Sequence, residues 1–284
     1  MIPAAFEYHR PSDMNAALGV LAEHGEEARV LAGGHSLIPM MKLRMTSIGH
    51  LVDLQDIAEL RGIAIDGGEV RIGAMVTQAD LIMDTALADV APILREAAVQ
   101  IADPQVRYMG TLGGNVANGD PGNDMPGLMQ CLDARFTLVG PGGRREVAAR
   151  DFYISAYVTE RADDEILTEI RFVAPAGGFA YEKQKRKVGD YATAACAVTL
   201  AKANGICTAA SVAMTNLADR PIWSKAAGAA LVGTACDAAA VKAATDAALA
   251  DIEPTADNRG PVEFKRHVAG IVISRAIQRA AARA

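Results

Sequence analysis

The chain has 284 residues, of which 51% are hydrophobic, and a formal net charge of -6. This length and composition allow two or three folded domains with real hydrophobic cores and exclude a disordered chain. The negative charge offers no basic surface for nucleic acid, and no apolar run approaches the roughly 20 residues that a helix needs to cross a bilayer. Because the first residues also lack the pattern of a secretory signal, we expect a cytoplasmic protein.

The cysteines and histidines are too scattered to indicate a metal centre. Cys131, Cys196, Cys207 and Cys236 include no C-x-x-C pair, so we expect buried thiols and neither a disulfide framework nor a zinc or iron–sulfur site. The five histidines show no paired spacing, and we expect no metal ion on this chain. Any electrons that pass through the protein therefore need an organic cofactor.

Helix and strand signals alternate over the first half of the chain. In chain order we predict a helix over about 12–25, short strands over 29–32 and 51–54, a hairpin over 62–73, and helices over 77–84 and 91–101. The first strand runs straight into Gly33 and Gly34. The segment 103–123 is predicted to be a loop because it holds five glycines and two prolines, and loops of that length in compact domains are usually functional.

Strand signals continue in the second half, and helices dominate its end. We predict strands over 136–140, 164–172 and from 179 onward, paired strands over 194–203 and 207–214, and helices over 225–231, 237–250 and 262–282. The Pro-Ala-Gly-Gly segment at 175–178 indicates a domain boundary. We therefore expect an α+β body followed by a smaller C-terminal domain.

Two diglycine turns, at 32–36 and 111–115, each combine a short apolar lead-in, Gly-Gly and a polar side chain. A diglycine lets the main chain approach a ligand closely and point successive N–H groups at phosphate oxygens, because no Cβ blocks the turn. One such turn alone is better explained as a tight connector, but two together fit a diphosphate. Neither turn has the dinucleotide-binding or P-loop signature, so a Rossmann fold is not indicated.

The loop after the second turn is rich in carboxylates and amides. Asp120 and Asp124 lie close to Asn118 and Asn123, where the ribityl or ribose hydroxyls of a nucleotide would need hydrogen-bond partners. Calcium is a rival ligand for these oxygen atoms, but their spacing does not match a calcium-binding loop. In the first turn, His35 is better explained as a residue that orients the loop or a cofactor than as a base or metal ligand.

The segment 181–191 is the most charged run in the chain and allows two interpretations. It could be a solvated edge strand that its lysines protect from pairing. It could equally be a cationic and aromatic wall beside a cofactor, with Tyr191 packed on a flat ring. The residues alone do not separate these two hypotheses.

Three segments carry a resemblance to a known family: AGGHSLIPMMKLRM at 32–45, IADPQVRYMGTLGGNVANGDPGNDMPGLMQCL at 101–132 and YEKQKRKVGDYATAACAV at 181–198. They resemble the FAD-binding medium subunits of the molybdenum hydroxylase (xanthine oxidase) family, and in particular those of aerobic carbon monoxide dehydrogenases. The resemblance covers essentially the whole chain. It implies two α/β subdomains, 1–58 and 59–176, that form an FAD cleft, and a C-terminal flavoprotein domain, 177–284, with a three-stranded antiparallel sheet and a helical bundle.

The resemblance also implies that both glycine turns cradle the FAD diphosphate. The implied FAD contacts are Ala32, Gly33, Gly34, His35, Ser36, Leu37, Ile101, Thr111, Leu112, Gly113, Gly114, Asn115, Asp124, Leu167, Lys185 and Tyr191. Lys183 and Lys185 both match the lysine of the family pattern, and we choose Lys185. No catalytic residue and no metal ligand is assigned to this chain, since substrate oxidation would occur on a partner.

The implied partners are a small subunit with two two-iron two-sulfur clusters and a large subunit with the molybdenum cofactor, in a dimer of heterotrimers. Electrons would pass from the clusters through FAD to a quinone or another acceptor, and the assembly could associate with the inner face of the membrane. The close alternative is the same subunit of a sister enzyme that oxidises a heterocycle or an aldehyde. A self-contained flavin reductase and a scaffold that binds no ligand are alternatives of other classes.

Overall fold

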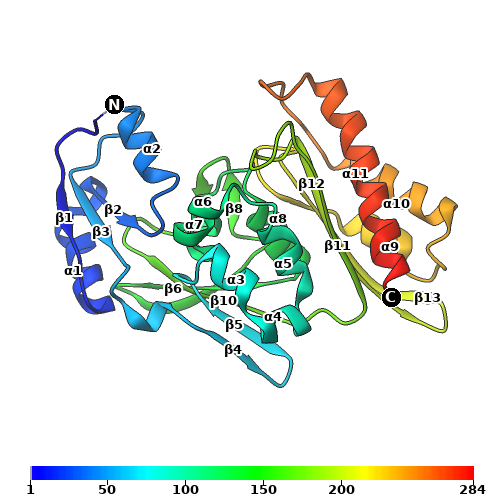
Figure 1. Cartoon of the computed structure of the whole chain (residues 1–284), viewed down its shortest axis with the longest axis horizontal. Coiled ribbons are helices and arrows are strands. Elements are labelled where there is room, and N and C mark those ends of the chain that lie inside the picture. Colours follow the sequence, from blue (N-terminus) through cyan, green and yellow to red (C-terminus); the bar gives the residue numbers. More distant parts are fainter. Residues whose placement is uncertain (1) are drawn as a thin grey trace.

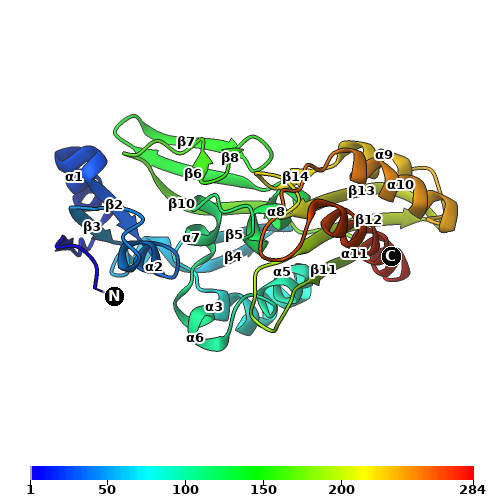
Figure 2. The same ribbon diagram turned by 90° about the horizontal axis from the view of Figure 1, so that it is seen from above.

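The computed structural model describes residues 2–284, which form three units in a row (Figures 1 and 2). The N-terminal unit has a parallel sheet in the order β1 (Glu7–His9), β3 (His50–Asp53), β2 (Ala28–Leu31). Its helices are α1 (Met14–His24), α2 (Leu37–Lys42) and the 3-10 helices η1 (Gly25–Glu27) and η2 (Ala58–Leu60). The helix, strand and turn expected here are confirmed, whereas β1 was not predicted because it is only three residues long and mostly exposed.

The middle unit is built on an antiparallel five-stranded sheet. Its order is β4 (Ile63–Asp66), β5 (Glu69–Gly73), β10 (Ile166–Val173), β6 (Arg135–Gly140), β7 (Gly143–Ala148). The helices are α3 (Gln78–Met83), α4 (Thr85–Val90), α5 (Pro92–Ala98), α6 (Pro104–Met109), α7 (Leu112–Ala117) and α8 (Asp124–Cys131), and β8 (Tyr153–Ser155) pairs with β9 (Val158–Thr159). The predicted hairpin is β4–β5.

The segment 103–123, predicted to be a loop, contains two short helices. Asp103 caps α6 by accepting a hydrogen bond from the Val106 N–H at 2.9 Å, and Pro104 occupies the first helical position, where its missing N–H costs nothing. Thr111 caps α7 in the same way, accepting from the Gly114 N–H at 3.0 Å. The prediction of a continuous loop was wrong. The two capping hydrogen bonds stabilise the short helices by more than the glycines destabilise them.

The C-terminal unit has the expected antiparallel sheet, in the order β11 (Gly178–Gln184), β12 (Ala194–Ala203), β13 (Ile206–Thr215), β14 (Ile222–Trp223). Three of these strands are long, and the two-residue β14 adds to them. The helices α9 (Lys225–Leu231), α10 (Ala238–Ala250) and α11 (Val262–Ala282) lie together beside this sheet (Figure 1). Within residues 2–284, no helix is both long and apolar enough to cross a membrane.

Buried side chains join the units to one another. One core cluster contains Leu94, Met125 and Phe136 of the middle unit together with Tyr181 and Ala197 of the C-terminal sheet. Every residue of α8 is buried, and an added Cβ at Gly127 would lie 2.3 Å from the Thr215 hydroxyl oxygen of β13. Because α8 is enclosed between two sheets, its first residue has a fixed position at the junction of the units.

Replacing Gly33 with alanine tests the close approach of the first glycine turn to α6. An added Cβ would lie 2.2 Å from the Met109 carbonyl oxygen, so the backbone has to move, at a cost of about 1–3 kcal/mol. Without any ligand, we expect the melting temperature to fall by roughly 2 °C or more. Gly19→Ala is the matched control, because Gly19 is exposed within α1 with no other atom within 4 Å, and alanine should stabilise the helix slightly. An unchanged melting temperature for Gly33→Ala would contradict this packing.

Candidate cofactor-binding site

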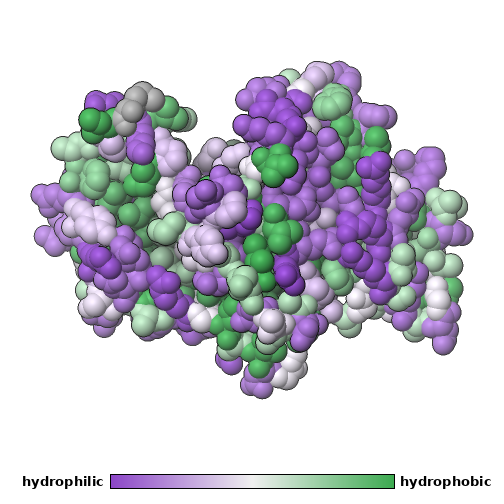
Figure 3. All heavy atoms as spheres, in the orientation of Figure 1, coloured by the Kyte–Doolittle hydropathy of each residue, from purple (hydrophilic) through white to green (hydrophobic). Residues whose placement is uncertain are grey.

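A cleft of ≈ 530 Å³ lies where the three units meet. Figure 3 shows the surface hollowed between the N-terminal unit and the rest of the molecule. The cleft is lined by both glycine turns, by the loop before α8 and by residues of the C-terminal unit. All of the predicted FAD contacts line it except Leu112, whose side chain is fully buried in the core, and Lys185.

The first glycine turn presents a row of unpaired main-chain donors. Within residues 2–284, none of the backbone N–H groups of residues 33–37 donates a hydrogen bond to the protein. Gly34 has a φ of 74°, a conformation that glycine adopts without strain. Because buried or half-buried N–H groups are nearly always paired, a row of free donors beside a cleft indicates a binding site for anionic oxygens.

The second glycine turn differs, because its main-chain donors at residues 112–115 already have partners. The Leu112 and Gly113 N–H groups bond the carbonyl oxygens of Val76 and Ala74 at 2.8 and 2.9 Å. The Gly114 N–H bonds the Thr111 hydroxyl at 3.0 Å, and the Asn115 N–H bonds the Thr111 carbonyl at 3.1 Å. The expectation that both turns offer free N–H groups to a diphosphate therefore holds in this structure only for the first.

The glycines of the second turn allow it to pack closely against neighbouring backbone and against the first turn. An added Cβ at Gly113 would lie 2.7 Å from the Ala74 carbonyl oxygen, and one at Gly114 would lie 3.3 Å from the Cβ of Ala32 in the first turn. The absence of side chains thus lets the two turns approach each other across the cleft. The second turn forms a wall against which the first turn presents its donors.

A buried ion pair closes the far side of the cleft. Asp124, the first residue of α8, accepts a bond from the Lys183 ammonium at 2.8 Å and from the Tyr181 hydroxyl at 2.5 Å. The side chains of Asp124 and Lys183 are only 6% and 1% exposed. Burial raises the pKa of the Asp124 carboxyl, and the Lys183 ammonium and the Tyr181 hydroxyl oppose that rise.

The structure distinguishes between the two candidate lysines. Lys183, on β11, lines the cleft and reaches Asp124, whereas Lys185 lies just beyond the strand and does not line the cleft. Burial is the main reason that the pKa of Lys185 is lowered, with the nearby Lys183 adding to the effect. Lys183 lines the cleft in this structure and Lys185 does not, and the choice of Lys185 as the FAD contact stays a prediction.

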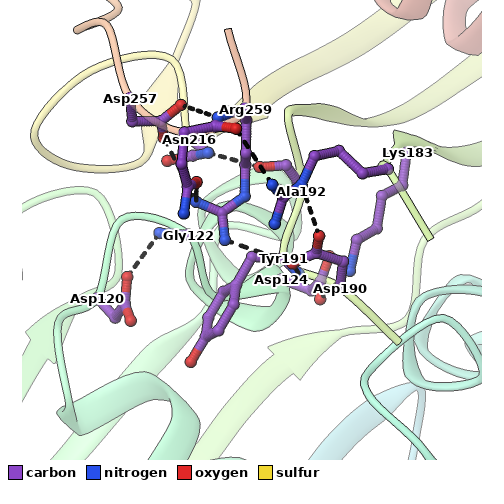
Figure 4. A network of polar contacts seen from close by, with 12 residues as sticks. Asp120, Gly122, Asp124, Lys183, Asp190, Tyr191, Ala192, Asn216, Asp257 and Arg259 are labelled. Carbon is purple, nitrogen blue, oxygen red and sulfur yellow. Dashed lines mark hydrogen bonds and ion pairs between the residues drawn. The ribbon is translucent and has the colours of Figure 1, made fainter. Parts of the chain in front are cut away.

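Tyr191 stands at the cleft edge on a loop held by ion pairs (Figure 4). Arg186 and Arg259 contact the Asp190 carboxylate at 3.0 and 3.4 Å, and the Arg259 guanidinium lies 5.5 Å from the centre of the Tyr191 ring. The ring packs close to Gly122, where an added Cβ would be 3.0 Å from the ring. Burial, together with Asp120, raises the pKa of the Tyr191 hydroxyl, so the side chain is a neutral, flat surface at neutral pH.

Several lining residues were not predicted from sequence. Gln78, Tyr157 and Arg161 line the cleft, together with Asn118 of the predicted acidic loop. The Gln78 Oε1 and Asn118 Nδ2 atoms are buried and have no hydrogen-bond partner within residues 2–284. A polar ligand in the cleft could form hydrogen bonds with these two unpartnered atoms and with the free main-chain N–H groups beside them. No motif indicated Gln78, Tyr157 or Arg161, since their role depends on the position of the cleft.

The predicted acidic loop does not gather its carboxylates around one point. Asp120 accepts the Gly122 N–H at 2.9 Å, whereas Asp124 pairs with Lys183. The Asn123 amide donates to the Asn115 carbonyl oxygen at 2.9 Å. These contacts fix the loop against the second turn.

A larger recess of ≈ 770 Å³ lies elsewhere, between the start of α1 and the β4–β5 hairpin, and includes no predicted cofactor residue.

Comparison with known proteins agrees with this geometry. Residues 4–174 match the FAD binding domain in molybdopterin dehydrogenase, and residues 179–280 match the CO dehydrogenase flavoprotein C-terminal domain. The chain is 55% identical to the carbon monoxide dehydrogenase medium chain of Afipia carboxidovorans, covering 100% of this chain and 99% of that one. It is 46% identical to that of Hydrogenophaga pseudoflava, with the same coverage of 100% and 99%.

A solved structure has the same fold along its full length. Reconstituted CO dehydrogenase from Oligotropha carboxidovorans contains a chain that is 54% identical, with a TM-score of 0.99 and complete coverage of both chains. An FAD-binding domain and a flavoprotein C-terminal domain together account for nearly all of the sequence. This chain therefore belongs to the family of FAD-binding medium subunits of molybdenum hydroxylases.

Proposed function

We propose that this chain is the FAD-carrying, electron-transferring subunit of an aerobic carbon monoxide dehydrogenase. The observation that carries this proposal is the identity of 55% over the full length to a carbon monoxide dehydrogenase medium chain. The carbon monoxide dehydrogenase medium chain of Hydrogenophaga pseudoflava is 46% identical over the same span. We also propose domain divisions at 58/59 and 176/177, which agree with the separate sheets of the three units.

The cleft fits FAD in charge and in hydrogen-bonding groups. We assign the free N–H groups of residues 33–37 to the diphosphate, because they are the unpaired donors of the two turns. Gln78 and Asn118 offer one orphaned acceptor and one orphaned donor to the sugar-like part of the cofactor. Tyr191 offers its flat face to the ring system, and Lys183 places a buried cation in the same cleft.

The bound FAD supplies the redox chemistry, and this chain supplies binding, orientation and electrostatics. Lys183 holds its ammonium in place through Asp124, which in turn is fixed by the enclosed helix α8. A buried cation favours added negative charge nearby, so this lysine assists the arrival of electrons in the cleft. Asp190 and its two arginine partners hold Tyr191 at the cleft edge, where it limits the access of water.

The partners remain part of the proposal. We propose that a small subunit with two two-iron two-sulfur clusters delivers electrons and that a large subunit with the molybdenum cofactor oxidises the substrate. We further propose that the assembly is a dimer of heterotrimers and that a quinone or another acceptor removes the electrons. The three buried cysteines and the partly buried Cys236 have no shared cluster geometry within residues 2–284, which is consistent with cluster binding on a partner.

Co-expression with the partner subunits tests the assigned substrate. The purified assembly is expected to oxidise CO with an artificial or quinone acceptor, and to lose transfer to the quinone when FAD is removed from this chain. A matched assay offers an aromatic N-heterocycle and an aldehyde to the same preparation. Oxidation of either of these without any oxidation of CO would contradict the proposed substrate while leaving the FAD assignment intact.

Exchanging the two lysines for methionine tests which of them faces the cofactor. Lys183→Met removes the cleft cation and leaves Asp124 unpaired in the interior, which costs about 3–5 kcal/mol of stability. We expect FAD affinity, measured by fluorescence titration, to fall at least about tenfold, which corresponds to ~1.4 kcal/mol. Lys185→Met is the matched control and should change the affinity little.

A double variant separates binding from folding. Asp124→Asn combined with Lys183→Met removes the unpaired charge, so the melting temperature should recover relative to the single variant. FAD affinity should remain low, because the cation is still absent. A double variant that regains full affinity, or a larger loss in Lys185→Met than in Lys183→Met, would refute the assignment of Lys183.

A further inference from the structure

Three histidines that are far apart in the sequence meet in the N-terminal unit, away from the cofactor cleft. His9 is the last residue of β1, His24 the last of α1 and His50 the first of β3. One ring nitrogen from each of them lies within 4.8 Å of the other two. All three side chains are partly buried. Nothing in their spacing indicated this cluster, which arises from the topology of the parallel sheet.

The register of the sheet explains why the rings converge. His50 of the central strand β3 pairs with Glu7 of β1 on one side and with Ala28 of β2 on the other. Since side chains alternate along a strand, His9 projects from the same face as Glu7 and can reach back toward His50. The chain leaves α1 at His24 and enters β2 at Ala28 after one short 3-10 turn, so the His24 ring arrives at the same face.

The distances suit coordination of one ion. His9 Nε2 and His50 Nδ1 are 3.0 Å apart, and the rings of His24 and His50 are parallel within 4°, with centroids 3.6 Å apart. Ligand atoms around a tetrahedral ion with bonds of about 2.0–2.1 Å are separated by roughly 3.3 Å. To aim their in-plane nitrogens at a common point, the His24 and His50 rings have to rotate out of this parallel stack, which the soft terminal torsion of histidine allows.

The donor set selects the class of ion. Neutral imidazole nitrogens bind borderline transition metals such as Zn²⁺, Co²⁺, Ni²⁺ and Cu²⁺, whereas Ca²⁺ and Mg²⁺ prefer oxygen. Two carboxylates stand next to the rings: Glu7 Oε2 is 3.7 Å from His50 Nδ1, and Glu23 Oε2 is 4.0 Å from His24 Nε2. Either can supply a fourth ligand and partly neutralise the charge of a divalent ion.

We propose that His9, His24 and His50 form a binding site for a divalent transition-metal cation, which fastens the end of α1 to β1 and β3. The site lies at the amino ends of β2 and β3, whereas the first glycine turn follows the carboxyl end of β2 (Figure 1). It is therefore separate from the cofactor cleft. It does not depend on the function proposed above.

Cobalt titration of the full-length chain, stripped of metal with a chelator, tests this site. We expect one Co²⁺ per chain with visible absorption bands, and at least about tenfold weaker binding in His24→Gln and in His50→Gln. His267→Gln is the matched control, since His267 is exposed on α11, and it should bind Co²⁺ like the unaltered chain. The proposal would be overturned if the unaltered chain bound no Co²⁺, or if all of these variants bound Co²⁺ as tightly as it does.

Thermal melting with Zn²⁺ gives a second readout that does not rely on cobalt bands. An ion that binds only the folded chain raises its melting temperature, so the unaltered chain and His267→Gln should both show a rise. His24→Gln and His9→Gln, at partly exposed positions where folding is expected to persist, should not show it. If Zn²⁺ leaves every melting temperature unchanged, the rings only stack and hydrogen-bond with one another, and the proposal fails.

Discussion

The buried ion pair between Asp124 and Lys183 is the interaction on which the cleft depends. It connects the first residue of a fully enclosed helix to a strand of the C-terminal sheet, with both side chains almost inaccessible to water. A charge in such a place is stable only with its partner, so the two units have to keep their relative position. That position in turn places Tyr191, Lys183 and the two glycine turns around one space.

The two glycine turns look alike in sequence and differ in what they do. The first leaves the N–H groups of residues 33–37 without protein partners, and the second uses its own to bind Thr111 and the carbonyl oxygens of Ala74 and Val76. One turn is therefore the donor surface, and the other is a rigid wall that lets the first approach. We propose that this division lets a chain with no Rossmann signature hold the FAD diphosphate.

Periodicity was enough to predict most of the fold and both turns. The hairpin over 62–73 could be predicted because its apolar positions alternate, and the long helix over 262–282 because it is rich in alanine. The short helices within 103–123 could not be predicted, since single capping hydrogen bonds determine whether they form. Lys183 could not be separated from Lys185, nor the histidine cluster foreseen, because each depends on contacts between residues that are distant in sequence.

We propose that the first glycine turn receives the FAD diphosphate through its free N–H groups. Hydrogen exchange of the main-chain amides, followed with and without FAD, tests it most directly, because exchange reports the protection of individual N–H groups. We expect the amides of residues 33–37 to exchange rapidly without FAD and to become protected when it binds, while those of 112–115 are protected throughout. Unchanged exchange at 33–37 in the FAD-loaded chain would contradict it.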